Sequence, residues 1–306
     1  MEAAHAYSPR PRGSQIIVVL ALALPALLGA LALGTDIAVL YYNWHLLQSA
    51  ADSAALAGAS YLPGYPALAV SNATAYAQRN GVARDEIVSI SIASDNQSLT
   101  VRLTRSVPYR FGVLLGLFGG RVTARATARL KTVGAARGVT PIGIDYRTRY
   151  TAGQVVTLLE GRVGPGNWSP LGLGGSGAAN FLTNVEYGYQ GSVAVNDWLA
   201  TEPGIKAGPV GEAFQYLIDR GRSMDPGGTF SNHTRNDPRV LIVPMVDFSS
   251  INGRDEVPVK GFAALWLVGV NSKNDIQTYF ISEVAPHSIP DSNAMNFGAY
   301  KAVLVE

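Results

Sequence analysis

Hydrophobic residues are continuous near the start of the chain and periodic or alternating farther on. Residues 16–34 are nineteen consecutive uncharged residues. At the helical rise they span roughly 28 Å, about the thickness of the hydrocarbon core of a bilayer. We therefore expect a single transmembrane helix over 16–34. Pro25 lies inside this run and predicts a kink rather than a break, because neighbouring groups can compensate for one missing hydrogen bond.

Beyond the apolar run, hydrophobic residues recur at three- and four-residue steps, the spacing of a helix that packs along another helix. The positions predicted to make these helix contacts are Ile37, Leu40, Trp44, Leu47, Ala51, Ala54 and Gly58. The stripe changes from bulky to small residues, and small residues allow two backbones to approach closely. The contact is either with the same domain or with a second subunit, and the pattern leaves both open.

The next hundred residues alternate in a way that predicts a small sheet. A short Ala-rich helix is expected over 66–80, followed by strands over 88–92 and 99–104. The apolar segment 111–118 leads into a third strand, 122–131, in which Val, Ala and Leu alternate with Arg, Thr and Lys. We predict an antiparallel sheet with helices on its apolar face.

From residue 138 onward the pattern becomes β-rich. A Gly/Pro-rich stretch over 161–180 predicts an irregular loop. One amphipathic helix is marked by Val210, Phe214, Leu217 and Ile218, and strands are expected over 240–248, 257–270 and 276–284. Pro244 is expected at a sheet edge or a bulge, because proline cannot donate a ladder hydrogen bond.

These elements define an α+β chain: one N-terminal transmembrane helix that continues into a long helix, a small antiparallel sheet module and a β-rich C-terminal domain. The predicted units are a cytoplasmic tail (1–15), the transmembrane helix (16–34), a helix-plus-sheet module (35–131) and a β-rich extracytoplasmic domain of unknown type (132–306).

Charge around the apolar run predicts its orientation. Arg10 and Arg12 precede the run, whereas Asp36 and Asp52 follow it. The positive-inside tendency places the N-terminus in the cytoplasm and the bulk of the chain outside it. The alternative is a cleaved signal peptide ending at Ala32, but the apolar run exceeds the usual apolar region of roughly 7–15 residues. The absence of Cys from the 306 residues excludes disulfides, a thiol nucleophile and Cys-ligated metals.

Basic residues concentrate in one module. Between residues 96 and 144 there are eight basic residues and no acidic residue. The candidate basic patch on one face of the first sheet is Arg102, Arg121, Arg125 and Arg129. Such a face suits anionic lipid headgroups, an anionic envelope polymer or an acidic subunit, and the ordinary alternative is a solvated face. Nucleic acid is not expected, because the patch lacks interleaved aromatic residues and lies outside the cytoplasm.

Two segments of the sequence match known cofactor or metal motifs only incompletely. Residues 172–177 (GLGGSG) match a dinucleotide fingerprint as a string, and Asp197 follows at a suitable distance, but residues 168–170 (WSP) interrupt the strand that the motif requires. Asp247 begins a sequence similar to a D-x-S-x-S metal motif, but Ile251 stands where the last Ser should be. We expect a turn at Asp247, no metal, no cofactor and no enzymatic activity.

The residues around the first helix resemble a known family. The carriers of the resemblance are Arg12-Gly13-Ser14-Gln15, Asp36 and a string over 47–59 with the family-motif residues Gln48, Asp52, Ala55, Leu56, Ala57 and Ala59. Together with the Ala-rich helix and the strands up to residue 131, they resemble the TadE/TadG-like proteins of the Tad (tight-adherence, Flp) pilus assembly system.

The resemblance implies a bacterial single-pass protein of the inner membrane that acts as an accessory or anchoring component without catalysis. Its implied partners are pilin-like subunits or proteins of the assembly platform. If Gly13 were a prepilin cleavage point, Val18 would stand where pilins carry Glu, so an uncleaved TadG-like anchor fits better. The alternative function is an exported envelope-binding or adhesive protein with the same anchor.

Overall fold

A computed structural model describes residues 13–148, 151–158, 168–202, 207–234, 236–249, 255–271 and 275–305. The predicted tail up to residue 12, with Arg10 and Arg12, lies outside the described residues, and so does Ile251.

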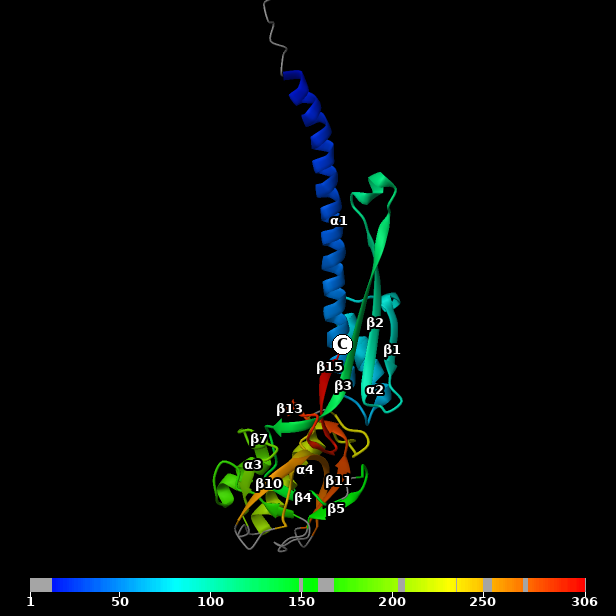
Figure 1. Cartoon of the computed structure of the whole chain (residues 1–306). Helices are drawn as coiled ribbons and strands as arrows, with labels where there is room; N and C mark the ends of the chain where they lie inside the picture. The colour runs from blue at the N-terminus through cyan, green and yellow to red at the C-terminus, as the bar shows by residue number, and fades with distance from the viewer. Residues whose placement is uncertain are drawn as a thin grey trace, which may run out of the picture.

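A long helix and a long β-hairpin extend side by side from a more compact lower body (Figure 1). The helices are α1 (Gly13–Ala59), α2 (Pro66–Arg79), α3 (Ala178–Tyr187) and α4 (Ala207–Met224), with 3-10 turns η1 (Arg84–Glu86) and η2 (Gly112–Leu115). The α+β class predicted from the sequence is confirmed. Helix α1 is continuous through Pro25, so the predicted span and the amphipathic stripe form one element.

The strands of the described residues form two sheets. The first has the order β1-β2-β3-β15-β12, with β7 and β13 also paired to β3. Its strands are β1 (Ile87–Ile92), β2 (Ser98–Pro108), β3 (Gly119–Ala136), β7 (Val193–Ala194), β12 (Glu283–Val284), β13 (Ser288–Pro290) and β15 (Ala299–Val305).

The second sheet has the order β5-β11-β10-β9-β4-β6, with β8 and β14 also paired to β10. Its strands are β4 (Ile142–Asp145), β5 (Val155–Leu158), β6 (Trp168–Pro170), β8 (Trp198–Ala200), β9 (Val240–Val246), β10 (Glu256–Val270), β11 (Ile276–Ile281) and β14 (Met295–Phe297).

The first sheet packs its apolar face on α1 and α2. Leu99, Val101 and Leu103 of β2 share a core with the alanines of β3, of α2 and of the lower part of α1. Strict alternation along β2 and β3 leaves Thr, Ser and Arg on the opposite face, so one face is buried and the other is solvated. The predicted helix-on-sheet module is confirmed.

The first sheet does not end where the first module was expected to end. Strand β3 continues to Ala136, past residue 131, and β15 returns from the far end of the described chain to pair with it, Tyr300 opposite Thr132. A strand from the region assigned to the second domain therefore completes the first sheet.

The second sheet is covered on both faces. One face packs on α3 and α4 through Phe181, Phe214 and Leu265, and the other packs on the lower end of β3 through Val133, Phe262 and other residues. Burial on both faces explains why β10 reads as a nearly unbroken apolar run.

Two details of this region differ from the sequence-based expectations. Pro244 lies in β9, between β10 and β4, so it is not at a sheet edge. The expected bulge lies close by, because the pairing of β10 with β9 is irregular between Val259 and Gly261, and Phe262 is the residue opposite Pro244. The pairing of β9 with β4 begins at Met245, one residue after the proline. The stretch expected to be an irregular loop over 161–180 contains strand β6 and the first turn of α3.

Candidate functional site

The lower half of the helix-contact stripe is buried inside the chain. Leu47, Ala51 and Ala54 are fully buried, and a Cβ placed on Gly58 would lie 2.7 Å from Leu99 Cδ1 and 2.8 Å from the Ala69 carbonyl oxygen. The small residues thus allow α1 to approach α2 and β2 closely. For these positions, the helix partner lies within the same domain.

The upper half of the same stripe is open. Ile37 is 64% exposed and Trp44 is 40% exposed, whereas Leu40 is half-buried. Tyr41, which is 63% exposed, lies beside Trp44 with ring centroids 5.8 Å apart. An apolar and aromatic strip therefore runs along α1 just beyond the predicted membrane span. We call Ile37, Tyr41 and Trp44 the aromatic strip.

The family-motif residue Gln48 joins α1 to an unpaired part of the first sheet. Its Nε2 donates to the Arg125 carbonyl oxygen at 2.9 Å, and its Oε1 accepts the Arg125 N–H at 3.4 Å. Strand β15 ends at Val305, opposite Thr127, so it does not reach Arg125. Gln48 takes the place of a neighbouring strand there, and it also donates to Asp52 at 2.9 Å. Of the remaining motif residues, two are buried (Ala55 and Ala59) and two are half-buried (Leu56 and Ala57).

Asp36 fixes the far end of the β2–β3 hairpin to α1. Its Oδ1 accepts the Arg110 N–H at 2.7 Å, and its Oδ2 accepts the N–H groups of Phe111 at 3.1 Å and Gly112 at 2.7 Å. The side chain is 5% exposed. In the sequence Asp36 indicated only the orientation and the family resemblance, and its contact with the hairpin is not predictable from local pattern. The two segments are 74 positions apart, so no local pattern connects them.

The end of this hairpin is apolar and exposed. We define the hairpin tip as residues 109–118, which contain η2 and the turns around it. Its large apolar side chains are solvent-accessible in the isolated chain: Phe111 43%, Val113 46%, Leu114 84%, Leu115 69%, Leu117 52% and Phe118 75%. In Figure 1 the hairpin tip stands beside α1, far from the lower body.

The four arginines of the candidate basic patch share the solvated face of the first sheet. All four are exposed, and Arg102 lies directly opposite Arg125 on the neighbouring strand. Within the described residues none of the four forms an ion pair. The patch can therefore meet an anionic partner without first breaking a salt bridge.

A second polar cluster joins the first module to the lower body. Tyr65, between α1 and α2, places its hydroxyl 3.0 Å from His233 Nδ1. His233 stacks on Trp266 at 4.7 Å between centroids, and its Nε2 lies 3.4 Å from Oε2 of Glu283. Arg239 also contacts Trp266, with its guanidinium 4.5 Å from the ring centroid.

The surroundings of His233 favour its charged form. Burial opposes protonation, but the Glu283 carboxylate and the Thr229 carbonyl oxygen outweigh it and raise the pKa of His233 above its ordinary value. Nδ1 lies 2.9 Å from the Thr229 carbonyl oxygen and therefore carries the proton. In neutral His233 the lone pair of Nε2 would then face a carboxylate, and protonation removes that repulsion. At 3.4 Å the contact with Glu283 is an ion pair rather than a well-formed hydrogen bond.

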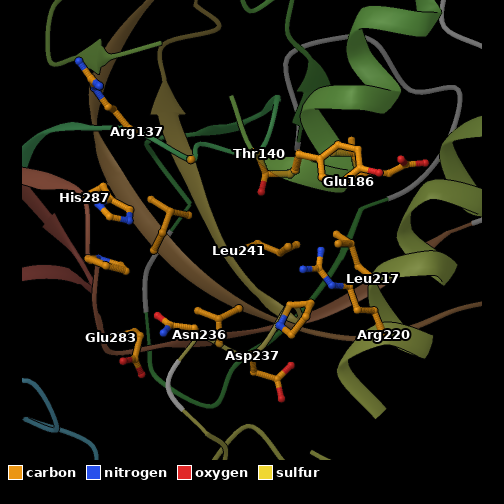
Figure 2. Close-up of a pocket in the computed structure, with 18 of the residues that line it drawn as sticks. Arg137, Thr140, Glu186, Leu217, Arg220, Asn236, Asp237, Leu241, Glu283 and His287 are labelled. Atoms are coloured by element: carbon orange, nitrogen blue, oxygen red, sulfur yellow. The ribbon is translucent and has the colours of Figure 1, made fainter. Parts of the chain in front are cut away.

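A cleft of about 510 Å³ opens beside this cluster, between α3, α4, β9 and the segment after β12. Its rim carries charges of both signs, including Arg137, Glu186 and Arg220, and its floor includes Leu241. Figure 2 shows Arg220 extending from α4 toward Leu241. The mixture of charges gives the cleft no preference for one sign of ligand.

The two motifs discounted in the sequence have structural roles. Residues 172–177 connect β6 to α3, and their carbonyl groups are held by α3: Asn180 Nδ2 donates to Gly175 O, and Asn184 Nδ2 donates to Leu173 O. Asp247 accepts the Ser249 N–H at 3.0 Å, which is the expected turn.

Comparison with protein families identifies the N-terminal part of the chain. Residues 14–60 match a family described as putative Flp pilus-assembly TadE/G-like. This segment of the chain is therefore similar to a TadE/G-like Flp pilus-assembly domain. The match covers α1 but not the first sheet, whereas the resemblance seen in the sequence extends over residues 12–131. Comparisons with curated proteins and with solved structures gave no significant match.

Proposed function

We propose that this chain is a non-catalytic component of Tad/Flp pilus assembly, anchored in the inner membrane by α1 with its N-terminus in the cytoplasm. Over the stretch just outside the bilayer, α1 packs against a helix of a pilin-like subunit or of the assembly platform. The two modules below it are extracytoplasmic.

The observation that carries this proposal is the division of α1 into two halves. Beyond Leu47 the stripe is filled by α2 and the first sheet, whereas the aromatic strip before it is 40–64% exposed. The same helix is the part of the chain that matches a pilus-assembly family. Exposed Tyr and Trp on a rigid helix are the side chains that most often anchor interfaces.

Site-specific photo-crosslinking in native membranes tests the proposal. Tyr41 and Tyr216 are each replaced by a benzophenone amino acid of similar shape; Tyr216 is 42% exposed on α4 and serves as the matched control. We expect Tyr41 to yield adducts with a second membrane subunit of the pilus machinery and Tyr216 to yield none. Lipid adducts alone at Tyr41, together with normal piliation in a deletion strain, would exclude the proposed role.

The basic patch supports a second candidate function, an exported protein that binds anionic envelope polymer. Arg102, Arg121, Arg125 and Arg129 present unpaired charge on one flat face. Binding of the purified protein to polyanionic wall polymer, abolished by replacing the four arginines with glutamine, would favour this function. A normal pilus count in the same variant would separate it from the assembly role.

A further inference from the structure

We propose that the hairpin tip inserts into the outer leaflet of the bilayer beside α1, so that the protein contacts lipid through a second element besides the membrane helix. The inference rests on the anchoring part of the proposed function and not on pilus assembly. It concerns residues 109–118, outside the helix that matches the family.

The hairpin tip is attached to α1 close to the point where the predicted membrane span ends. Asp36, which accepts the hydrogen bonds from the hairpin tip, lies two residues beyond the predicted span 16–34, or about 3 Å along the helix axis. Tyr41, Tyr42 and Trp44, residues typical of the membrane–water interface, come later on the helix. The attachment of the hairpin tip thus lies between the end of the apolar span and the aromatic residues.

The second argument is the surface of the hairpin tip. Residues 111–118 contain no charged or hydrogen-bonding side chain. Six large apolar side chains are exposed there, with Leu114 at 84% and Phe118 at 75%. An apolar patch of this kind on a soluble surface marks an interaction site. On α1 the residues on either side of Asp36 include Leu33 and Ile37, which are also exposed, at 45% and 64%.

The third argument is the backbone of the hairpin tip. Irregular backbone enters lipid only when its polar groups are satisfied internally. Asp36 accepts the N–H groups of Arg110, Phe111 and Gly112. Farther along, Leu114, Gly116 and Leu117 donate to carbonyl groups of the hairpin tip itself, and Tyr109 donates to Phe118. Asp36 and these turns therefore satisfy seven N–H groups of the hairpin tip that would otherwise oppose insertion.

The arginines at and near the hairpin tip are consistent with its insertion into the outer leaflet. Arg110, at the start of the hairpin tip, and Arg121, three residues after its end, are both exposed. Arginine side chains at such positions extend toward the headgroup phosphates while their apolar stems remain near the acyl region. A protein partner would be expected to offer or require some polar contact, which residues 111–118 lack.

Fluorescence quenching by lipid tests the inference on the full chain. Because the protein has no Cys, single variants can be labelled with an environment-sensitive dye. We choose Leu114→Cys for the hairpin tip, Leu22→Cys for the membrane span and Val88→Cys for the solvated part of β1; these residues are 84%, 72% and 60% exposed. The protein is reconstituted in phosphatidylcholine–phosphatidylglycerol vesicles that contain nitroxide lipid.

We expect strong quenching and a blue shift at Leu22 and Leu114, and neither at Val88. Quenching at Leu22 without quenching at Leu114 would overturn the inference and leave the membrane anchor intact. Absence of quenching at Leu22 would show that α1 is not the anchor. A blue shift at Leu114 that grows with protein density but shows no lipid quenching would assign the hairpin tip to a second copy and refute lipid insertion. Phe118→Cys repeats the test at the C-terminal end of the hairpin tip.

Discussion

The close approach of α1 to α2 at Gly58 gives a quantitative test of the packing between the two helices. In Gly58→Ala the added methyl group would lie 2.7 Å from Leu99 Cδ1, 2.8 Å from Ala69 O and 2.9 Å from Ala73 Cβ. Carbon atoms prefer separations of about 3.5–4.0 Å. The Leu99 methyl group can rotate away, but the Ala69 carbonyl is backbone, so the two helices must separate by a sizeable fraction of an ångström.

Two opposing terms set the size of the effect. Overpacking of a core costs about 1–3 kcal/mol. Replacing Gly by Ala inside a helix returns about 1 kcal/mol through backbone entropy. The net expectation for Gly58→Ala is a loss of about 1 kcal/mol, which for a domain of this size lowers the unfolding midpoint by roughly 2–4 °C.

Thermal unfolding of the purified protein in detergent, followed by circular dichroism, measures this shift. Gly34→Ala is the matched control, because a Cβ at Gly34 meets nothing within 4 Å. It should raise the midpoint slightly, because the alanine gains helix propensity without a clash. Gly58→Val should lower it further than Gly58→Ala. An unchanged or higher midpoint for Gly58→Ala would refute the close approach of α1 to α2.

Three other predictions follow from polar contacts. Asp36→Ala should speed hydrogen exchange at the Gly112 amide, because that N–H loses its 2.7 Å acceptor, while Thr35→Ala should not; equal exchange in all three proteins would argue against this contact of Asp36. The raised pKa of His233 means that its contribution to stability is full below about pH 6.5 and is lost as the pH rises through the higher folded-state pKa. The midpoint difference between wild type and His233→Gln should therefore be larger at roughly pH 5.5 than at pH 8.5, and a difference that does not vary with pH would count against the ion pair with its carboxylate partner. Arg125→Glu converts a cross-strand pair of like charges into an ion pair and should raise the midpoint slightly at low salt; a lower midpoint would contradict the pairing register.

Sequence patterns predicted the elements that depend on local periodicity. The apolar run and the three- and four-residue stripe predicted α1, and the alternation of apolar and polar residues predicted β2 and β3. The turn at Asp247 followed from local chemistry. The same stripe could not distinguish a partner in the same chain from a second subunit, because Ala and Gly at helical spacing suit both. Burial of Ala54 and exposure of Tyr41 became visible only in the folded chain.

The contacts that place the hairpin tip and join the modules are long-range. Asp36 and Gly112 are 76 positions apart, and Tyr65 and His233 are 168 apart. Their partners are ordinary backbone groups or a single side chain, which leave no repeated pattern in the sequence. The segment 111–118 was recognised as apolar, but an apolar octapeptide alone does not distinguish a core strand from an exposed turn.

The pairing of β15 with β3 has a consequence for the order in which the protein can be made. Thr132 pairs with Tyr300, so 168 positions separate the two partners in the chain. In the topology proposed above, α1 reaches the membrane early in synthesis, whereas one edge of β3 lacks its neighbour until almost all of the described chain has followed. An unpaired strand edge readily recruits other chains. Gln48 of α1 bonds to Arg125, outside the Thr127–Thr132 stretch that pairs with β15, so that stretch stays open to other chains until β15 has been made.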